Sequence, residues 1–272
     1  MKTVKGLHEK MGTFENANTS FHQAARCKRY TNEVLAFSMV KEEELLRATE
    51  EIQNLTYRQG EYKIFKVFEP KERLIMALPF YDRVVQHMIC NAIQPVFENG
   101  FYYHSYACRS GKGMHAASDT LYQWMYETEV KQGLRMYAFK GDISKYFASI
   151  PHDKLKDENR HYIGDKKALM LMDDIIDHNG ILPDGVGIPV GNLTSQLFAN
   201  VYGNKLDKFC KHVLHIPYFV RYMDDFIILS DDLEQLKEWV KRIEEFLENE
   251  MLLHINPKST ILYACLLYTS PS

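Results

Sequence analysis

Residues 217–229 read Pro-Tyr-Phe-Val-Arg-Tyr-Met-Asp-Asp-Phe-Ile-Ile-Leu, and this stretch is the most informative part of the sequence. Aromatic and aliphatic strand formers flank a short Met-Asp-Asp, which predicts a β-hairpin with two carboxylates at its bend. Adjacent carboxylates repel each other unless a positive charge compensates them. Mg²⁺ commonly binds through one or two carboxylates together with substrate phosphates, so the hairpin is a candidate metal site. The alternative is a solvated Asp-Asp turn without a ligand.

A second carboxylate has a similar setting. Residues 136–151 read Met-Tyr-Ala-Phe-Lys-Gly-Asp-Ile-Ser-Lys-Tyr-Phe-Ala-Ser-Ile-Pro, in which an apolar strand is expected to end at Asp142. A strand end presents a ligand from a rigid element. Asp142 and Asp224 together are expected to hold two Mg²⁺ ions, the arrangement that clamps the attacking and leaving oxygens in phosphoryl or nucleotidyl transfer.

These two motifs resemble motif A and motif C of reverse transcriptases. The resemblance implies that Asp142, Asp224 and the Ile143 carbonyl are metal ligands, with Asp225 as a supporting carboxylate, and that Mn²⁺ can replace Mg²⁺. Phe147 falls at the family's steric-gate position, where a ring crowds the sugar 2′-hydroxyl and favours deoxynucleotides. An ordinary core aromatic is the alternative for Phe147.

Further segments match the same family. Residues 187–200 resemble motif B, which implies that Val190, Gly191 and Gln196 meet the templating base and the incoming dNTP. Lys258 lies where motif D carries a Lys suited to protonate the pyrophosphate leaving group.

Two cationic segments lie upstream. Residues 71–87 resemble the fingers of bacterial reverse transcriptases, where Lys71 and Arg73 would contact the triphosphate as a point charge and a bidentate donor, respectively. Arg109 and Lys112 lie in a glycine-punctuated loop that is expected to grip nucleic-acid backbone. Solvated surface cations are the alternative for Lys71 and Arg73.

The motif B segment narrows the choice among reverse transcriptase subfamilies. Many reverse transcriptases have Gln before the motif B glycine, whereas this chain has Val190, and Ser195-Gln196 follows. This pattern resembles the enzymes of diversity-generating retroelements, which copy a template RNA into error-containing cDNA with the help of a small basic accessory protein. Group II intron, retron and phage-defence reverse transcriptases are neighbouring alternatives. An RNA-dependent RNA polymerase and a non-catalytic RNA-binding relic are more distant ones.

The composition of the chain bears on its nucleic-acid surface, its cellular compartment and its relation to membranes. The 272 residues carry 33 Lys and Arg against 36 Asp and Glu, a net charge of −3 that does not favour a uniformly basic nucleic-acid surface. Much of the acidity lies in residues 231–250, whose apolar spacing predicts an amphipathic helix. Five Cys without a Cys-x-x-Cys pair indicate buried free thiols in a reducing compartment. No signal peptide or membrane-length apolar run is present, so we expect a cytoplasmic protein without a membrane partner.

The expected fold is α+β: the fingers and palm of a right-hand polymerase, with an antiparallel palm sheet backed by helices. We expect a helical extension over residues 1–60 and fingers and palm over 61–264. We expect the family's thumb to be missing and residues 265–272 to be a non-native tail. Predicted strands cover 62–68 and 74–78, and predicted helices cover 21–53, 82–97, 115–129 and 154–178.

Overall fold

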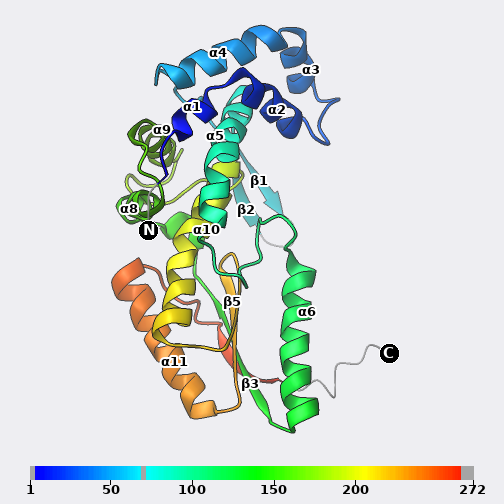
Figure 1. Ribbon diagram of the computed structural model, residues 1–272, viewed down its shortest axis with the longest axis vertical. Helices are drawn as coiled ribbons and strands as arrows, with labels where there is room; N and C mark the ends of the chain where they lie inside the picture. Colours follow the sequence, from blue (N-terminus) through cyan, green and yellow to red (C-terminus); the bar gives the residue numbers. More distant parts are fainter. Residues whose placement is uncertain (1–3, 69–71, 265–272) are drawn as a thin grey trace. The chain divides into compact units, whose positions relative to one another are not determined.

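The computed structural model describes residues 4–68 and 72–264 (Figure 1). Two compact units are formed by Met1–Gly100 with Pro151–Phe198, and by Phe101–Ile150 with Ala199–Ser272. Each unit thus draws on two separate stretches of chain. The tail expected at 265–272 lies outside the described residues.

The first unit is mainly helical. Helices α1 and α2 pack on the long helix α5, and the rings of Phe21, Phe37 and Phe80 form one aromatic cluster of the core. A two-stranded antiparallel sheet pairs Lys63 with Ala77, which confirms the predicted strand pair to within two residues at each end. The elements of this unit are α1 (Leu7–Met11), α2 (Phe14–Ala24), α3 (Asn32–Met39), α4 (Lys41–Gln53), β1 (Lys63–Phe68), β2 (Glu72–Ala77), α5 (Phe80–Glu98), α8 (His152–Tyr162), α9 (Lys166–Asp177) and the start of α10 (Leu193–Lys208).

Two helical predictions in this unit were too long. Residues 21–53 form the end of α2, then α3 and α4. Cys27, between α2 and α3, has a positive φ of 61°, and Val40, between α3 and α4, has a φ of −121° and a ψ of 27°; neither conformation is that of a right-handed helix. Residues 154–178 form two helices, since Asp165 caps α9 by accepting hydrogen bonds from the N–H groups of Lys167 and Ala168. The Asp165 carboxylate also accepts from the N–H groups of Leu7 and His8.

The second unit is built on a four-stranded antiparallel sheet of order β4-β5-β3-β6 (Figure 1). Helix α11 packs against β3 and β5, and α6 packs against β4. This is the helix-backed antiparallel sheet that the sequence predicts. The elements are α6 (Met114–Met125), the π-helical turn η1 (Tyr126–Lys131), β3 (Met136–Asp142), α7 (Tyr146–Ser149), the end of α10, η2 (Phe209–Val213), β4 (Tyr218–Tyr222), β5 (Asp225–Ser230), α11 (Leu233–Phe246), η3 (Leu247–Met251) and β6 (Thr260–Ala264).

The two faces of this sheet differ in burial near the β4–β5 turn. Gly141, Phe226 and Arg221 occupy directly opposed positions on three neighbouring strands, and all three are buried. The next row of opposed positions, Asp142, Asp225 and Tyr222, belongs to the other face and is half-buried or exposed. The chain therefore presents its carboxylates on the open face.

Cysteine placement departs partly from expectation. Cys27, Cys90, Cys108 and Cys210 are all free, but Cys27 and Cys108 are exposed rather than buried. Within residues 4–68 and 72–264, no helix combines the length and the apolar character that crossing a bilayer requires.

Gly141 sets the packing of β3 on β5, because a Cβ at this position would overlap the Phe226 ring. We expect Gly141→Ala to lower the free energy of unfolding by about 1–3 kcal/mol, as overpacking of a core usually does. Urea denaturation measures the loss. The double variant Gly141→Ala/Phe226→Leu gives the new methyl group room and should recover part of it. A single variant as stable as the parent would contradict the prediction.

Candidate active site

The two motifs meet at one end of the four-stranded sheet. Strands β4 and β5 form the predicted hairpin, with Met223 and Asp224 as its two-residue turn and Met223 at a positive φ of 59°. Asp142, the last residue of β3, lies directly opposite Asp225, the first residue of β5. The Ile143 N–H donates to the Asp224 carbonyl at 3.2 Å. Three carboxylates from two distant stretches of sequence therefore gather at one sheet end.

A loop near the end of the described chain anchors Asp142. The Asn256 side-chain amide donates to the Asp142 carboxylate at 2.7 Å, and the Asn256 main-chain N–H donates to the Asp142 carbonyl, also at 2.7 Å. The Ser259 hydroxyl accepts from the Asp142 N–H at 3.1 Å. Asp142 is thus held at its carbonyl, amide and carboxylate, and one carboxylate oxygen has a fixed donor.

The donors at this end suit a hard divalent cation, which prefers carboxylate and carbonyl oxygens. Among residues 4–68 and 72–264, no group of three or more His, Cys, Asp or Glu is arranged to hold a metal ion unaided. Mg²⁺ needs no such cage when substrate phosphates and water complete its coordination. Asp142 and Asp225, in opposed positions of the sheet with Asp224 in the adjoining turn, are the carboxylates available to such a shared site.

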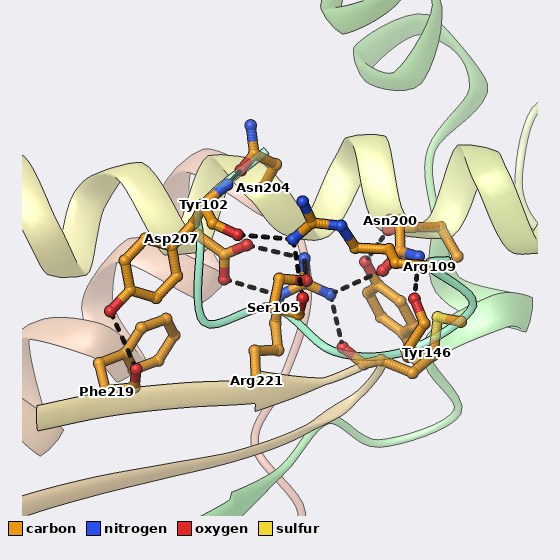
Figure 2. A network of polar contacts seen from close by, with 12 residues as sticks. Tyr102, Ser105, Arg109, Tyr146, Asn200, Asn204, Asp207, Phe219 and Arg221 are labelled. Atoms are coloured by element: carbon orange, nitrogen blue, oxygen red, sulfur yellow. Dashed lines mark hydrogen bonds and ion pairs between the residues drawn. The ribbon is translucent and has the colours of Figure 1, made fainter. Parts of the chain in front are cut away.

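Behind the hairpin turn lies a buried ion pair, shown in Figure 2. Arg221 of β4 is fully buried and binds Asp207 of α10 bidentately, with Nε to Oδ1 at 2.6 Å and Nη2 to Oδ2 at 2.7 Å. The guanidinium also donates from Nη2 to the Ser105 hydroxyl at 3.1 Å and from Nη1 to the Asn200 amide oxygen at 3.3 Å. A fifth bond runs from Nη1 to the Met223 carbonyl at 2.9 Å.

These contacts explain how a charged pair can be buried in the protein interior. Burial by itself lowers the pKa of Arg221, but the Asp207 carboxylate outweighs this and raises the pKa above its ordinary value. Burial raises the pKa of the Asp207 carboxyl, and the adjacent guanidinium opposes that shift. A guanidinium keeps its proton in proteins and offers five N–H donors, each of which has an acceptor here. The guanidinium is therefore charged and fully hydrogen-bonded.

Phe147 and Lys258 lie in the same unit as the carboxylates. Phe147 belongs to the short helix α7, is half-buried, and its ring makes an edge contact with Tyr146 at 5.9 Å. Lys258 is exposed, in the loop that Asn256 ties to Asp142. Their proposed roles as steric gate and proton donor remain predictions.

Arg109 and Lys112 bind the loop that carries them. Arg109 donates to the carbonyls of Tyr102 and Ser105, each at 2.7 Å. Lys112 donates to the Tyr103 carbonyl at 2.8 Å, and its ammonium lies 3.5 Å from the Tyr103 ring centroid. Both side chains thus contribute to loop structure, and nucleic-acid binding by either one stays a prediction.

The remaining predicted residues belong to the first unit. The Val190 carbonyl accepts from the Met76 N–H at 3.1 Å, so the motif B turn is bound to β2. Gly191 has a φ of +119°, and a Cβ there would lie 3.2 Å from the Met76 carbonyl oxygen, which explains the glycine. Gln196 is exposed on the first turn of α10. Arg73 lies within β2, and Lys71 lies outside the described residues.

Sequence reasoning missed Arg221, Asp207 and Asn256. One signal was available: Asn200, Asn204 and Asp207 recur at helical spacing in an otherwise apolar segment, which marks a buried polar stripe. A second signal was Arg221, a charged residue between Val220 and Tyr222 in a predicted strand. Nothing in the sequence pairs Asn256 with Asp142.

Comparison with known proteins identifies the family of this chain. Residues 66–265 match the family model described as reverse transcriptase (RNA-dependent DNA polymerase). Among curated proteins, Protein YkfC of Escherichia coli is 28% identical over 134 residues, covering 47% of this chain and 34% of that protein. An uncharacterized 91 kDa protein in a cob intron of Schizosaccharomyces pombe is 29% identical over 137 residues, covering 48% of this chain and 16% of that protein. The chain therefore spans about a third or less of these relatives.

Solved structures share the fold. Apo telomerase from Candida tropicalis, truncated from its C-terminal domain, has a TM-score of 0.56 at 14% identity, covering 77% of this chain and 51% of that one. Telomerase from Candida albicans, solved with a fragment of telomeric RNA, has a TM-score of 0.54 at 11% identity, covering 80% and 45%. This likeness confirms the predicted fold class. Because the family model spans well over half of its length, the chain belongs to the reverse transcriptase (RNA-dependent DNA polymerase) family.

Proposed function

We propose that this chain is the fingers and palm of an RNA-directed DNA polymerase, which extends a primer with dNTPs along a template RNA. The observation that carries the proposal is the cluster of Asp142, Asp224 and Asp225 at one end of an open sheet face. Carboxylates brought to one place repel each other, and a divalent cation bound between them would compensate that repulsion. Members of this family generally use divalent metal ions, which fits this donor set.

Two Mg²⁺ ions, or Mn²⁺ in their place, are the proposed cofactors. Asp142, Asp224, Asp225 and the Ile143 carbonyl would hold them. When bound, the ions stabilise charge on the attacking and leaving oxygens of the transferred phosphoryl group. The chain itself fixes the ligands: Asn256 orients the Asp142 carboxylate, and the β3–β5 pairing places Asp225 opposite it. Preorganised ligands reduce the free energy needed to reach the transition state.

The finer assignment is an error-prone enzyme of a diversity-generating retroelement, with a small basic accessory protein as a further partner. Val190 before Gly191 supports it, because Val offers dispersion and shape where Gln can hydrogen-bond near the nascent base pair. Losing one net hydrogen bond weakens selection by about 1 kcal/mol, which raises misincorporation several-fold. The free Cys thiols support a reducing compartment such as the cytoplasm.

A group II intron type of enzyme is the second candidate, favoured by the similarity to a protein encoded in a cob intron. Errors concentrated opposite template adenines would support the retroelement assignment. An even error spectrum would support the intron type.

Primer extension on an RNA template with Mg²⁺ and dNTPs tests the proposed activity, with product sequencing to read the errors. We expect Asp142→Asn and Asp224→Asn to abolish extension, since each removes a charged ligand while keeping the side-chain shape. Lys241→Ala, at an exposed position on α11, is the matched surface control. If the parent chain binds RNA but extends no primer, the chain is a non-catalytic RNA-binding protein.

Asn256 provides a second test, because its amide donates to the Asp142 carboxylate. We expect Asn256→Ala to lower the extension rate about 10-fold, the lower end of what loss of such a supporting bond costs. Higher Mg²⁺ should restore part of the rate. Asn256→Asp should be worse, because it places a like charge beside Asp142. Parent-like rates for both variants at limiting Mg²⁺ would show that the bond has no part in the reaction.

The proposed steric-gate role of Phe147 is tested by measuring the preference for deoxynucleotides over ribonucleotides. We expect Phe147→Ala to raise ribonucleotide incorporation relative to deoxynucleotide on the order of tenfold, the usual value of a lost steric contact in a pocket. Single-nucleotide extension with matched dNTP and rNTP pairs gives the ratio. Phe147→Tyr keeps the ring and should keep the preference. Unchanged selectivity in Phe147→Ala would make this residue an ordinary packing aromatic.

A further inference from the structure

The turn that carries Asp224 is held from behind by one side chain. Arg221 Nη1 donates to the Met223 carbonyl, which belongs to the peptide bond leading into Asp224. Met223 has a φ of 59°, a left-handed conformation that a side chain with a Cβ adopts only at a cost. Such conformations persist where the surrounding structure fixes them. The bond from Arg221 is a contact that can do so.

Arg221 in turn is held by two other segments of the chain (Figure 2). Helix α10 supplies Asp207 and Asn200, and the loop before α6 supplies the Ser105 hydroxyl. The same loop pairs with the main chain of Arg221 at the edge of the sheet: Arg221 N–H donates to the His104 carbonyl at 3.0 Å, and Tyr106 N–H donates to the Arg221 carbonyl at 2.9 Å. The guanidinium therefore transmits the position of α10 and of this loop to the turn.

The helix is shaped to receive this side chain. A Cβ at Gly203 would lie 2.6 Å from Arg221 Nη1 and 2.9 Å from the Tyr146 hydroxyl, so a glycine is needed for the guanidinium to reach Asp207 and Met223 together. Tyr146 is buried and donates to the Ala199 carbonyl at 2.7 Å on the same helix. Lys would not replace Arg here, because it has three donors and no planar fork.

We propose that Arg221 is a positioning residue for nucleotidyl transfer: with Asp207 as its anchor, it fixes the Met223–Asp224 peptide and thereby the Asp224 carboxylate. The inference rests on the proposed polymerase function. The bond to Met223 satisfies one buried guanidinium N–H and also restrains the turn, so the positioning role has to be measured separately from stability. Replacing a buried pair by apolar residues of similar size is often neutral for stability, which separates the two roles.

The test uses the full chain and two readouts, Mn²⁺ affinity from electron paramagnetic resonance and the rate of primer extension. We expect Arg221→Lys, and the apolar pair Arg221→Met/Asp207→Leu, to weaken Mn²⁺ binding and slow extension by about 10- to 100-fold, as loss of support behind a metal ligand does. Urea denaturation should show the apolar pair folded cooperatively. Tyr202→Phe is the matched control, since it deletes a buried bond from α10 to the Met251 carbonyl that does not reach the hairpin.

The possible outcomes distinguish failure of the positioning role from failure of the proposed polymerase function. A folded apolar pair with parent-like Mn²⁺ affinity and rate overturns the positioning role and leaves the polymerase assignment intact. Equal losses in Tyr202→Phe and Arg221→Lys also overturn it, because the effect then follows general stability. If the parent and Asp224→Asn bind Mn²⁺ equally and neither extends a primer, the proposed function itself fails, and the inference with it.

Discussion

The pairing register between β3 and β5 is the constraint on which the second unit depends. Gly141 faces Phe226 and Asp142 faces Asp225, so one step of register separates a buried row from the carboxylate row. A slip by one residue would turn the carboxylates into the core and the Phe226 ring into solvent, because side chains alternate strictly along a strand. Gly141 leaves the space that the ring fills, which disfavours every other register.

Charged groups concentrate at this end of the sheet. Asp142 and Asp225 lie in its more exposed row, Asp224 lies in the adjoining turn, and a fully buried Arg221–Asp207 pair lies behind the hairpin. A buried pair recovers its desolvation cost only with near-complete hydrogen bonding, and here every guanidinium N–H has an acceptor. One acceptor is the carbonyl at the turn, so the same contacts that satisfy the buried charge also restrain the residue beside Asp224.

Local signals were reliable where neighbouring residues alone decide the structure. The hairpin at 218–230, the strand ending at Asp142 and the amphipathic helix α11 all follow from apolar periodicity and turn chemistry. Helix boundaries were less predictable. The break before α9 depends on Asp165, whose carboxylate also binds the first turn of α1, a contact between residues 158 positions apart. Arg109 and Lys112 looked like cations for a ligand, yet both donate to carbonyls of their own loop.

The sequence by itself determined the fold class and the family, and it predicted the carboxylates of the site, because these depend on short motifs whose residues are neighbours in the chain. Only the tertiary structure decided what surrounds them. Asn256 on Asp142 is a contact across 114 positions, and Arg221 on Ser105 is one across 116. Such partners are chosen by strand register and helix packing, which bring distant polar groups together because a buried group without a partner is costly. Apolar periodicity in the sequence predicts which side chains are buried, but it does not predict which of them are in contact.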